Sequence, residues 1–235
     1  MTRNAVVTIN VSHKWDCLGQ ITSDTMANYA RKIKADFVNI NTIFVPHSKN
    51  RCIVFEKFQL YDLLTVYDRV MLVDYDAIIS DHCPDMFKIV PEDKLGVSTH
   101  HPVRFKQDVV EQFKDTEIDW QESKYWDSGV IVASRAHRDI FEYIKQPQLI
   151  VSCAEERTFN YRVYKYKIPV YELGHKFHFQ PGREKDVKLD PHIIHWAGGG
   201  RGGLKNVIAK SDQMKRDIAN YEDCKKRGFP KQWSK

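Results

Sequence analysis

Four consecutive apolar residues, Val70-Met71-Leu72-Val73, constrain the fold more than any other part of the sequence. The run does not alternate with polar residues, so it predicts a strand buried on both faces, as in the centre of a parallel sheet. Because further apolar runs alternate with segments of helical periodicity, we expect an α/β fold with a mostly parallel central sheet flanked by helices. The other predicted strands cover residues 5–11, 37–45, 95–98, 130–133, 168–173 and 193–196. The predicted helices cover residues 25–34, 55–67, 136–145, 158–166 and 211–227, with Ser211 as the cap of the last.

The composition supports one folded domain and excludes some classes of protein. Of 235 residues, 42% are apolar and 12% aromatic, which is enough for a sizeable core. Residues 211–235 hold seven Lys or Arg and four Asp or Glu, hence +3 of the net charge of +5, so the body lacks the basic face of a nucleic-acid-binding protein. We expect a domain over 1–210 and a basic C-terminal helix or tail over 211–235. The tail is either a solvated end, a linker to a further domain, or a weak contact with an anionic membrane surface through Lys225–Arg227 and Trp233.

The location of the protein is predicted from what the sequence lacks. It contains no run of about 18 apolar residues and no apolar signal segment at its start. The five cysteines are more than 30 residues apart, a spacing that fits neither a zinc knuckle nor a dense disulfide framework. We therefore expect free thiols, no transmembrane segment and a cytoplasmic protein.

Two aspartates, Asp74 and Asp76, follow the apolar run directly and are separated by Tyr75. In extended backbone residues i and i+2 point to the same side, and parallel sheets bind ligands at the carboxyl ends of their strands. Two neighbouring carboxylates repel, and a divalent cation between them relieves the repulsion and can bridge to a diphosphate. The alternative is a solvated Asp-x-Asp at a strand-to-turn junction.

A histidine and a glycine-rich segment close the predicted series of strands. His195 ends the apolar run Ile193-Ile194 and can supply a third metal ligand, for which imidazole suits Mn²⁺. In the following loop, Gly198 lets backbone N–H groups approach a phosphate and Arg201 can bind it. The alternatives are a histidine buried in the core and an ordinary turn. A dinucleotide-binding loop would follow the first strand, so the position of these glycines argues against an NAD-dependent enzyme.

Two acidic segments complete the candidate site. Asp127-Ser128-Gly129 precedes a predicted strand, where the glycine lets a sugar lie against the backbone and the aspartate can bind its hydroxyl groups. Glu155 and Glu156 open a predicted helix and can orient an acceptor hydroxyl or take its proton. Turn chemistry explains the first segment equally well, and favourable charge at a helix N-terminus explains the second.

Taken together and in this order, the segments resemble the metal-dependent glycosyltransferases of the GT-A fold, most closely the glycogenin-like group of family 8. The resemblance spans residues 5–203. Asp74-Tyr75-Asp76 matches the family's Asp-x-Asp, and Asp127-Ser128-Gly129 stands at its Asn-Ser-Gly. Glu155 and Glu156 replace its Asp-Gln pair, and Asn160 keeps its later Asn. The segment from His195 keeps the histidine and the first glycine, and Arg201 stands at the phosphate-binding lysine.

The resemblance implies an enzyme that moves a sugar from a nucleotide-sugar, by default a UDP-sugar, to a glycan or other hydroxyl acceptor. Asp74, Asp76 and His195 would coordinate Mn²⁺ or Mg²⁺ on the diphosphate. The other donor-binding residues would be Thr8, Asn10, Val11, Lys57, Tyr75, Gly198 and Arg201. The catalytic residues would be Asp127, Glu155 and Glu156. Retention of anomeric configuration is favoured; an inverting enzyme with Glu155 or Glu156 as the base, or a module that binds nucleotide-sugar without turnover, stays open.

Overall fold

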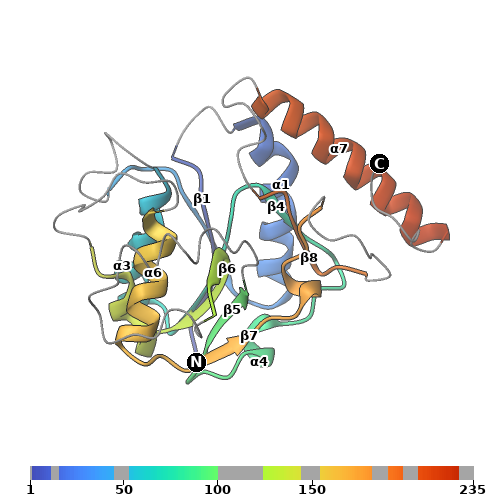
Figure 1. Cartoon of the computed structure of the whole chain (residues 1–235). Helices are drawn as coiled ribbons and strands as arrows, with labels where there is room; N and C mark the ends of the chain where they lie inside the picture. The colour runs from blue at the N-terminus through green and yellow to red at the C-terminus, as the bar shows by residue number, and fades with distance from the viewer. Residues whose placement is uncertain are drawn as a thin grey trace.

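The computed structural model describes residues 2–11, 16–44, 53–99, 124–143, 154–181, 190–197 and 206–227. Within these residues a six-stranded sheet forms the centre of the molecule, in the strand order β2-β1-β3-β6-β5-β7 (Figure 1). The strands are β1 (Asn4–Ile9), β2 (Asp36–Ile40), β3 (Arg69–Val73), β5 (Leu95–Thr99), β6 (Trp126–Ser134) and β7 (Val170–Glu172). Only β6 runs against its neighbours in this sheet, so the prediction of a mostly parallel sheet is confirmed.

Helices cover both faces of the central sheet. They are α1 (Asp16–Lys32), η2 (Ile53–Gln59), α3 (Leu60–Val66), α4 (Met86–Ile89), η3 (Arg135–Phe141), α6 (Ala154–Lys165), η4 (His175–Phe177) and α7 (Asn206–Arg227). Figure 1 shows α3 and α6 on one side of the sheet and α1 on the other, with α7 beyond α1. None of the helices in the described part of the chain has the length and apolar character that crossing a lipid bilayer requires.

The core follows from the alternation of side chains along the strands. Ala5 and Val7 of β1 pack with α3 and α6 on one face, and Val6 packs with α1 on the other. All five residues of β3 are buried, because this strand has helices on both sides. The uninterrupted apolar run at 70–73 is the sequence signature of that position.

A small two-stranded sheet lies beside the central one. β4 (Ala77–Ile79) and β8 (Ile193–His195) pair antiparallel, with Ala77 opposite His195. The predicted strand at 193–196 therefore exists but pairs with β4 and not with the central sheet. A third apolar cluster joins this pair to α1 and α7.

Several predicted boundaries are wrong. The helix predicted at 25–34 already begins at Asp16, and the segment 136–145 forms a 3-10 helix at 135–141. Asp127-Ser128-Gly129 lies within β6, since this strand begins at Trp126. Ser211 does not cap the last helix, because α7 begins at Asn206 and Ser211 is a buried residue inside it. The division of the chain into a domain over 1–210 and a tail over 211–235 falls within this helix and stays a prediction; Trp233 lies outside the described residues.

Candidate active site

The Asp74-Tyr75-Asp76 segment forms a tight turn between β3 and β4. The Asp74 amide donates to the Gly129 carbonyl at 2.8 Å, and the Ala77 amide donates back to the Asp74 carbonyl at 3.0 Å. This turn lets the chain leave the central sheet and enter the small one. It leaves both carboxylates partly accessible at the carboxyl end of β3, where open α/β sheets bind ligands.

Tyr75 anchors this turn to α1. Its hydroxyl accepts a hydrogen bond from Asn10 Nδ2 at 2.9 Å, and its carbonyl accepts one from Thr22 Oγ1 at 2.9 Å. A side chain at Gly19 would place its Cβ only 1.5 Å from the Tyr75 hydroxyl, so α1 needs a glycine at this contact. Tyr75 therefore holds the two aspartates in place, and its predicted role in donor binding stays a prediction.

The β4–β8 pairing brings His195 to the two aspartates. His195 Nε2 lies 3.1 Å from Asp76 Oδ1 and 3.7 Å from Asp74 Oδ2. One ligand atom from each residue lies within 4.8 Å of the others. The structure therefore brings His195 to Asp74 and Asp76, which are far from it in the sequence and were predicted with it as metal ligands.

These three side chains fit a divalent metal. Two carboxylate oxygens and one imidazole nitrogen form a donor set that suits Mn²⁺, while Mg²⁺ relies on the oxygens. Three protein ligands leave positions of a six-coordinate ion open for phosphate oxygens. Burial lowers the pKa of His195, but the neighbouring Asp76 and Asp74 outweigh it and raise the pKa overall. The two carboxylates that favour a proton on His195 Nε2 would equally favour a metal cation bound to that nitrogen instead of the proton.

Each aspartate also has a lysine partner. Lys57 Nζ lies 2.8 Å from Asp74 Oδ1, and Lys210 Nζ of α7 forms an ion pair with Asp76. Burial alone would lower the pKa of Lys57, but Asp74 and Glu155 raise it above its ordinary value. Burial would raise the pKa of Asp76, yet His195 and Lys210 hold it well below its ordinary range. Lys57 was predicted to face the nucleotide; Lys210 was missed.

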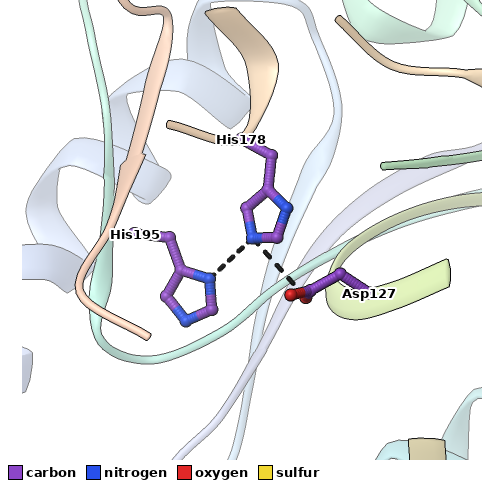
Figure 2. A group of neighbouring side chains, drawn as sticks. All are labelled: Asp127, His178 and His195. Carbon is purple, nitrogen blue, oxygen red and sulfur yellow. Dashed lines mark hydrogen bonds and ion pairs between the residues drawn. The ribbon is translucent and has the colours of Figure 1, made fainter. Parts of the chain in front are cut away.

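Behind His195 lies a second buried cluster, formed with His178 and Asp127 (Figure 2). His178 Nε2 lies 2.7 Å from His195 Nδ1 and 3.6 Å from Asp127 Oδ1. Asp127 accepts hydrogen bonds from the Gly129 amide at 2.7 Å and from Gln180 Nε2 at 3.0 Å. Neither His178 nor Gln180 was predicted as a site residue. Their i, i+2 spacing around an apolar residue was the available signal, because it places both on one side of an extended segment.

The two predicted catalytic glutamates lie at the start of α6. Glu156 Oε2 accepts from the backbone amide and hydroxyl of Ser128, both at 3.3 Å. Glu155 is 6% exposed, and its Oε2 has no hydrogen-bond partner among the residues that the structure describes. Burial raises the pKa of both carboxyls, and Asp127 raises the pKa of Glu156 further. Asn160, the third residue of the resemblance on this helix, hydrogen-bonds both backbone groups of Trp126 and holds α6 against β6.

The remaining predicted residues lie in or just after β1, or in the glycine-rich segment. Thr8 is fully buried, with no partner for its hydroxyl in the described part of the chain. Asn10 Nδ2 donates to Tyr75 and, at 3.0 Å, to Asp16, while Val11 packs against the core. Their contact with a nucleotide stays a prediction. Gly198 and Arg201 lie outside the described residues.

Comparison with known proteins relates the chain to solved structures only. No family model and no curated protein sequence matches it. It is similar to a glycosyltransferase involved in the glycosylation of the major capsid of PBCV-1, with 10% identity and a TM-score of 0.58 over 90% of this chain and 100% of that chain. The galactosyltransferase LgtC, solved with donor and acceptor sugar analogues, is 12% identical, with a TM-score of 0.54 over 89% of this chain and 95% of that chain. Mouse xyloside xylosyltransferase 1 is 9% identical, with a TM-score of 0.51 over 83% of this chain and 97% of that chain.

The chain has the fold of these glycosyltransferases. Identities this low establish the fold alone. The narrower resemblance to the glycogenin-like group stays a prediction.

Proposed function

We propose that the protein is a divalent-metal-dependent glycosyltransferase. Its donor is a nucleotide-sugar, with UDP as the carrier that the family resemblance implies, and its acceptor is a hydroxyl group of a glycan or another molecule. The observation that carries the proposal is the convergence of Asp74, Asp76 and His195 at the carboxyl end of β3. This convergence occurs in a fold that the chain shares with glycosyltransferases.

The three ligands and Lys57 have distinct tasks in this proposal. Asp74, Asp76 and His195 would hold the metal, which when bound neutralises the diphosphate that leaves with the nucleotide. Lys57 lies 3.0 Å from Asp74 Oδ2 and 3.1 Å from both oxygens of Ser128, so it joins the turn to β6 and orients the Asp74 carboxylate. We therefore assign Lys57 to positioning Asp74 in addition to its predicted place beside the nucleotide.

Among the three predicted catalytic acids, Glu155 is the one with a buried carboxylate oxygen that has no donor among the described residues. Asp127 and Glu156 accept hydrogen bonds from β6, and the Glu155 carboxyl accepts from backbone N–H groups at the start of α6, but Glu155 Oε2 accepts none from the described residues. A buried acceptor without a donor costs free energy, and a sugar hydroxyl would supply the missing donor. We assign Glu155 to the reacting sugar or the acceptor hydroxyl and propose retention of configuration; inversion would make Glu155 the base that takes the acceptor proton.

The test is a turnover assay with purified protein, Mn²⁺ and a panel of UDP- and GDP-sugars, with and without a chelator. We expect donor hydrolysis or transfer that requires the metal and is lost in Asp76→Asn and His195→Ala. Asp24→Asn, at an exposed position on α1, is the matched control and retains activity. Turnover that persists in the chelator contradicts the proposal. Metal-dependent nucleotide binding without turnover on any acceptor would identify a binding module.

NMR of the product's anomeric proton distinguishes the two stereochemical courses. A product with the donor's configuration supports retention. A product of opposite configuration, together with loss of transfer in Glu155→Gln, would assign Glu155 as the base of an inverting enzyme.

A further inference from the structure

Both aspartates of the candidate metal site already have a positive partner from the protein. Asp74 pairs with Lys57 of η2, and Asp76 pairs with Lys210 of α7. The side chains of the two lysines are only 12% and 9% exposed, so water screens these pairs less than it screens a surface salt bridge. The carboxylates that would attract a metal are therefore neutralised before any metal arrives.

The sum of charges at this site favours a metal only together with a diphosphate. Among the two aspartates and their two lysines the charges cancel, and His195 is neutral when it binds a metal, so a divalent ion that binds alone adds two positive charges beside Lys57 and Lys210. The two ionised phosphates of a nucleotide-sugar restore neutrality. Because like charges a few ångströms apart repel, the free protein should bind the ion weakly and the nucleotide-bound protein should bind it tightly.

Lys210 is held in place by the packing of α7. Residues 210, 214 and 217 lie on one face of the helix, since their spacing is i, i+4 and i+7. Met214 is fully buried in the cluster that joins α1, β4, β8 and α7. Trp196 directly follows the candidate ligand His195, and its Nε1 donates to Asp217 Oδ2 of α7 at 2.7 Å. The lysine thus belongs to a docked helix that is attached to the metal site at two points.

We propose that Lys210 is a cation of the donor site, which opposes binding of the free metal at Asp76 and binds the diphosphate of the nucleotide. The inference rests on the proposed function and adds α7 to the donor site. It makes metal and nucleotide binding cooperative: each lowers the cost of the other, by the same factor in both directions.

The experiment compares Lys210→Met with Lys215→Met, which removes the same charge from an exposed position of the same helix. Mn²⁺ is titrated into metal-free protein and followed by electron paramagnetic resonance. UDP, GDP and UMP are then titrated at saturating Mn²⁺ by calorimetry. We expect Lys210→Met to bind Mn²⁺ alone about tenfold more tightly, and the nucleoside diphosphate about tenfold more weakly, than the wild type. The affinity for UMP, which lacks the second phosphate, should fall much less in Lys210→Met. Lys215→Met should have the wild-type affinity for Mn²⁺ and for each nucleotide.

Lys210→Arg keeps the charge and should restore both affinities toward the wild type. A merely structural role for Lys210 predicts weaker binding of both Mn²⁺ and nucleotide in Lys210→Met, and that result overturns the proposal. Unchanged Mn²⁺ affinity or unchanged diphosphate affinity in a folded Lys210→Met variant also overturns it. If the wild type binds neither UDP nor GDP with Mn²⁺, the donor site itself fails and this proposal fails with it. If the wild type binds UDP or GDP with Mn²⁺ and the Lys210 variants have the same affinities, the proposed function stands and the proposed role of Lys210 is wrong.

Discussion

His178 Nε2 lies 2.7 Å from His195 Nδ1 (Figure 2), whereas the other ring nitrogen of His195, Nε2, faces Asp74 and Asp76. The side-chain amide of Gln180 donates to Asp127 and also lies 3.3 Å from His178 Nε2. When His195 Nε2 binds a metal, the remaining ring proton of His195 is on Nδ1, and His178 Nε2 is then the acceptor of the Nδ1–H. A metal-bound histidine commonly donates its second ring N–H to an acceptor in this way, which fixes the orientation of the ring.

We therefore expect His178 to position His195. In His178→Leu the Nδ1–H of His195 loses its acceptor, and Mn²⁺ affinity should fall by about 10- to 100-fold. His178→Gln offers an amide oxygen as acceptor and should recover part of that affinity, which a general packing defect would not allow. Calorimetry or paramagnetic resonance measures both variants, and a leucine variant with the affinity of the wild type contradicts this role.

Gly129 makes room for the same ring. A Cβ at this position would lie 2.4 Å from His195 Cε1 and 2.6 Å from His195 Nδ1, so Gly129→Ala must displace the imidazole. We expect this variant to lose Mn²⁺ binding although residue 129 is no ligand. Gly174→Ala is the control, because a Cβ there meets no atom within 4 Å. Equal metal affinity in the two variants would show that the position of the His195 ring does not matter.

The parts of the fold that depend on local pattern were predictable. Val70–Val73 predicted the doubly buried β3, and the placement of Asp74 and Asp76 directly after it follows from the same run. His195 was predicted to end a strand, and it ends β8. In each case the apolar periodicity and the neighbouring polar residue lie within a few positions of one another.

The contacts that complete the site were not predictable, since they join distant segments. Lys210 reaches Asp76 only because α7 begins before residue 210 and docks on α1, whereas the sequence suggested a helix starting at Ser211. His178 reaches His195 through a β-bridge between Phe179 and Ile194, 15 positions apart. No local pattern encodes such pairings, because tertiary packing decides them.

The attachment of α7 to the body can be measured by removing Asp217. Asp217→Ala leaves the buried Trp196 indole N–H without its acceptor, and we expect the free energy of unfolding to fall by about 1–3 kcal/mol. Denaturant unfolding gives this value. Asp212→Ala, at an exposed position of the same helix, should change it little. A loss that is no larger in Asp217→Ala than in Asp212→Ala would contradict the docking of α7 through this bond.

The buried carboxyl of Glu156 should make stability depend on pH. Burial, Asp127 and Glu155 raise its pKa in the folded protein, so the folded state binds the proton more tightly than the unfolded state. The contribution to stability is then fully present below the pKa of an unfolded glutamate, about 4.3, and is lost as pH rises through the folded pKa.

Glu156→Gln removes this loss and keeps an acceptor for Ser128. In chelator, its melting temperature should exceed that of the wild type by a few degrees at pH 7.5, and the difference should vanish below about pH 4.3. Glu222→Gln, at an exposed position of α7, should show no such trend. A Glu156→Gln variant that is less stable than the wild type at neutral pH would mean that the carboxylate is the favoured form.

Anomalous X-ray diffraction from a crystal soaked with Mn²⁺ and UDP tests the metal site most directly. Two clusters of the described residues offer ligand atoms within 4.8 Å of one another, Asp74–Asp76–His195 and Asp127–His178–His195. We predict one manganese peak bonded to Asp74, Asp76 and His195 Nε2, with the diphosphate on its open side. A peak between Asp127 and His178, or no peak at the first cluster in a crystal that has bound UDP, would contradict the account.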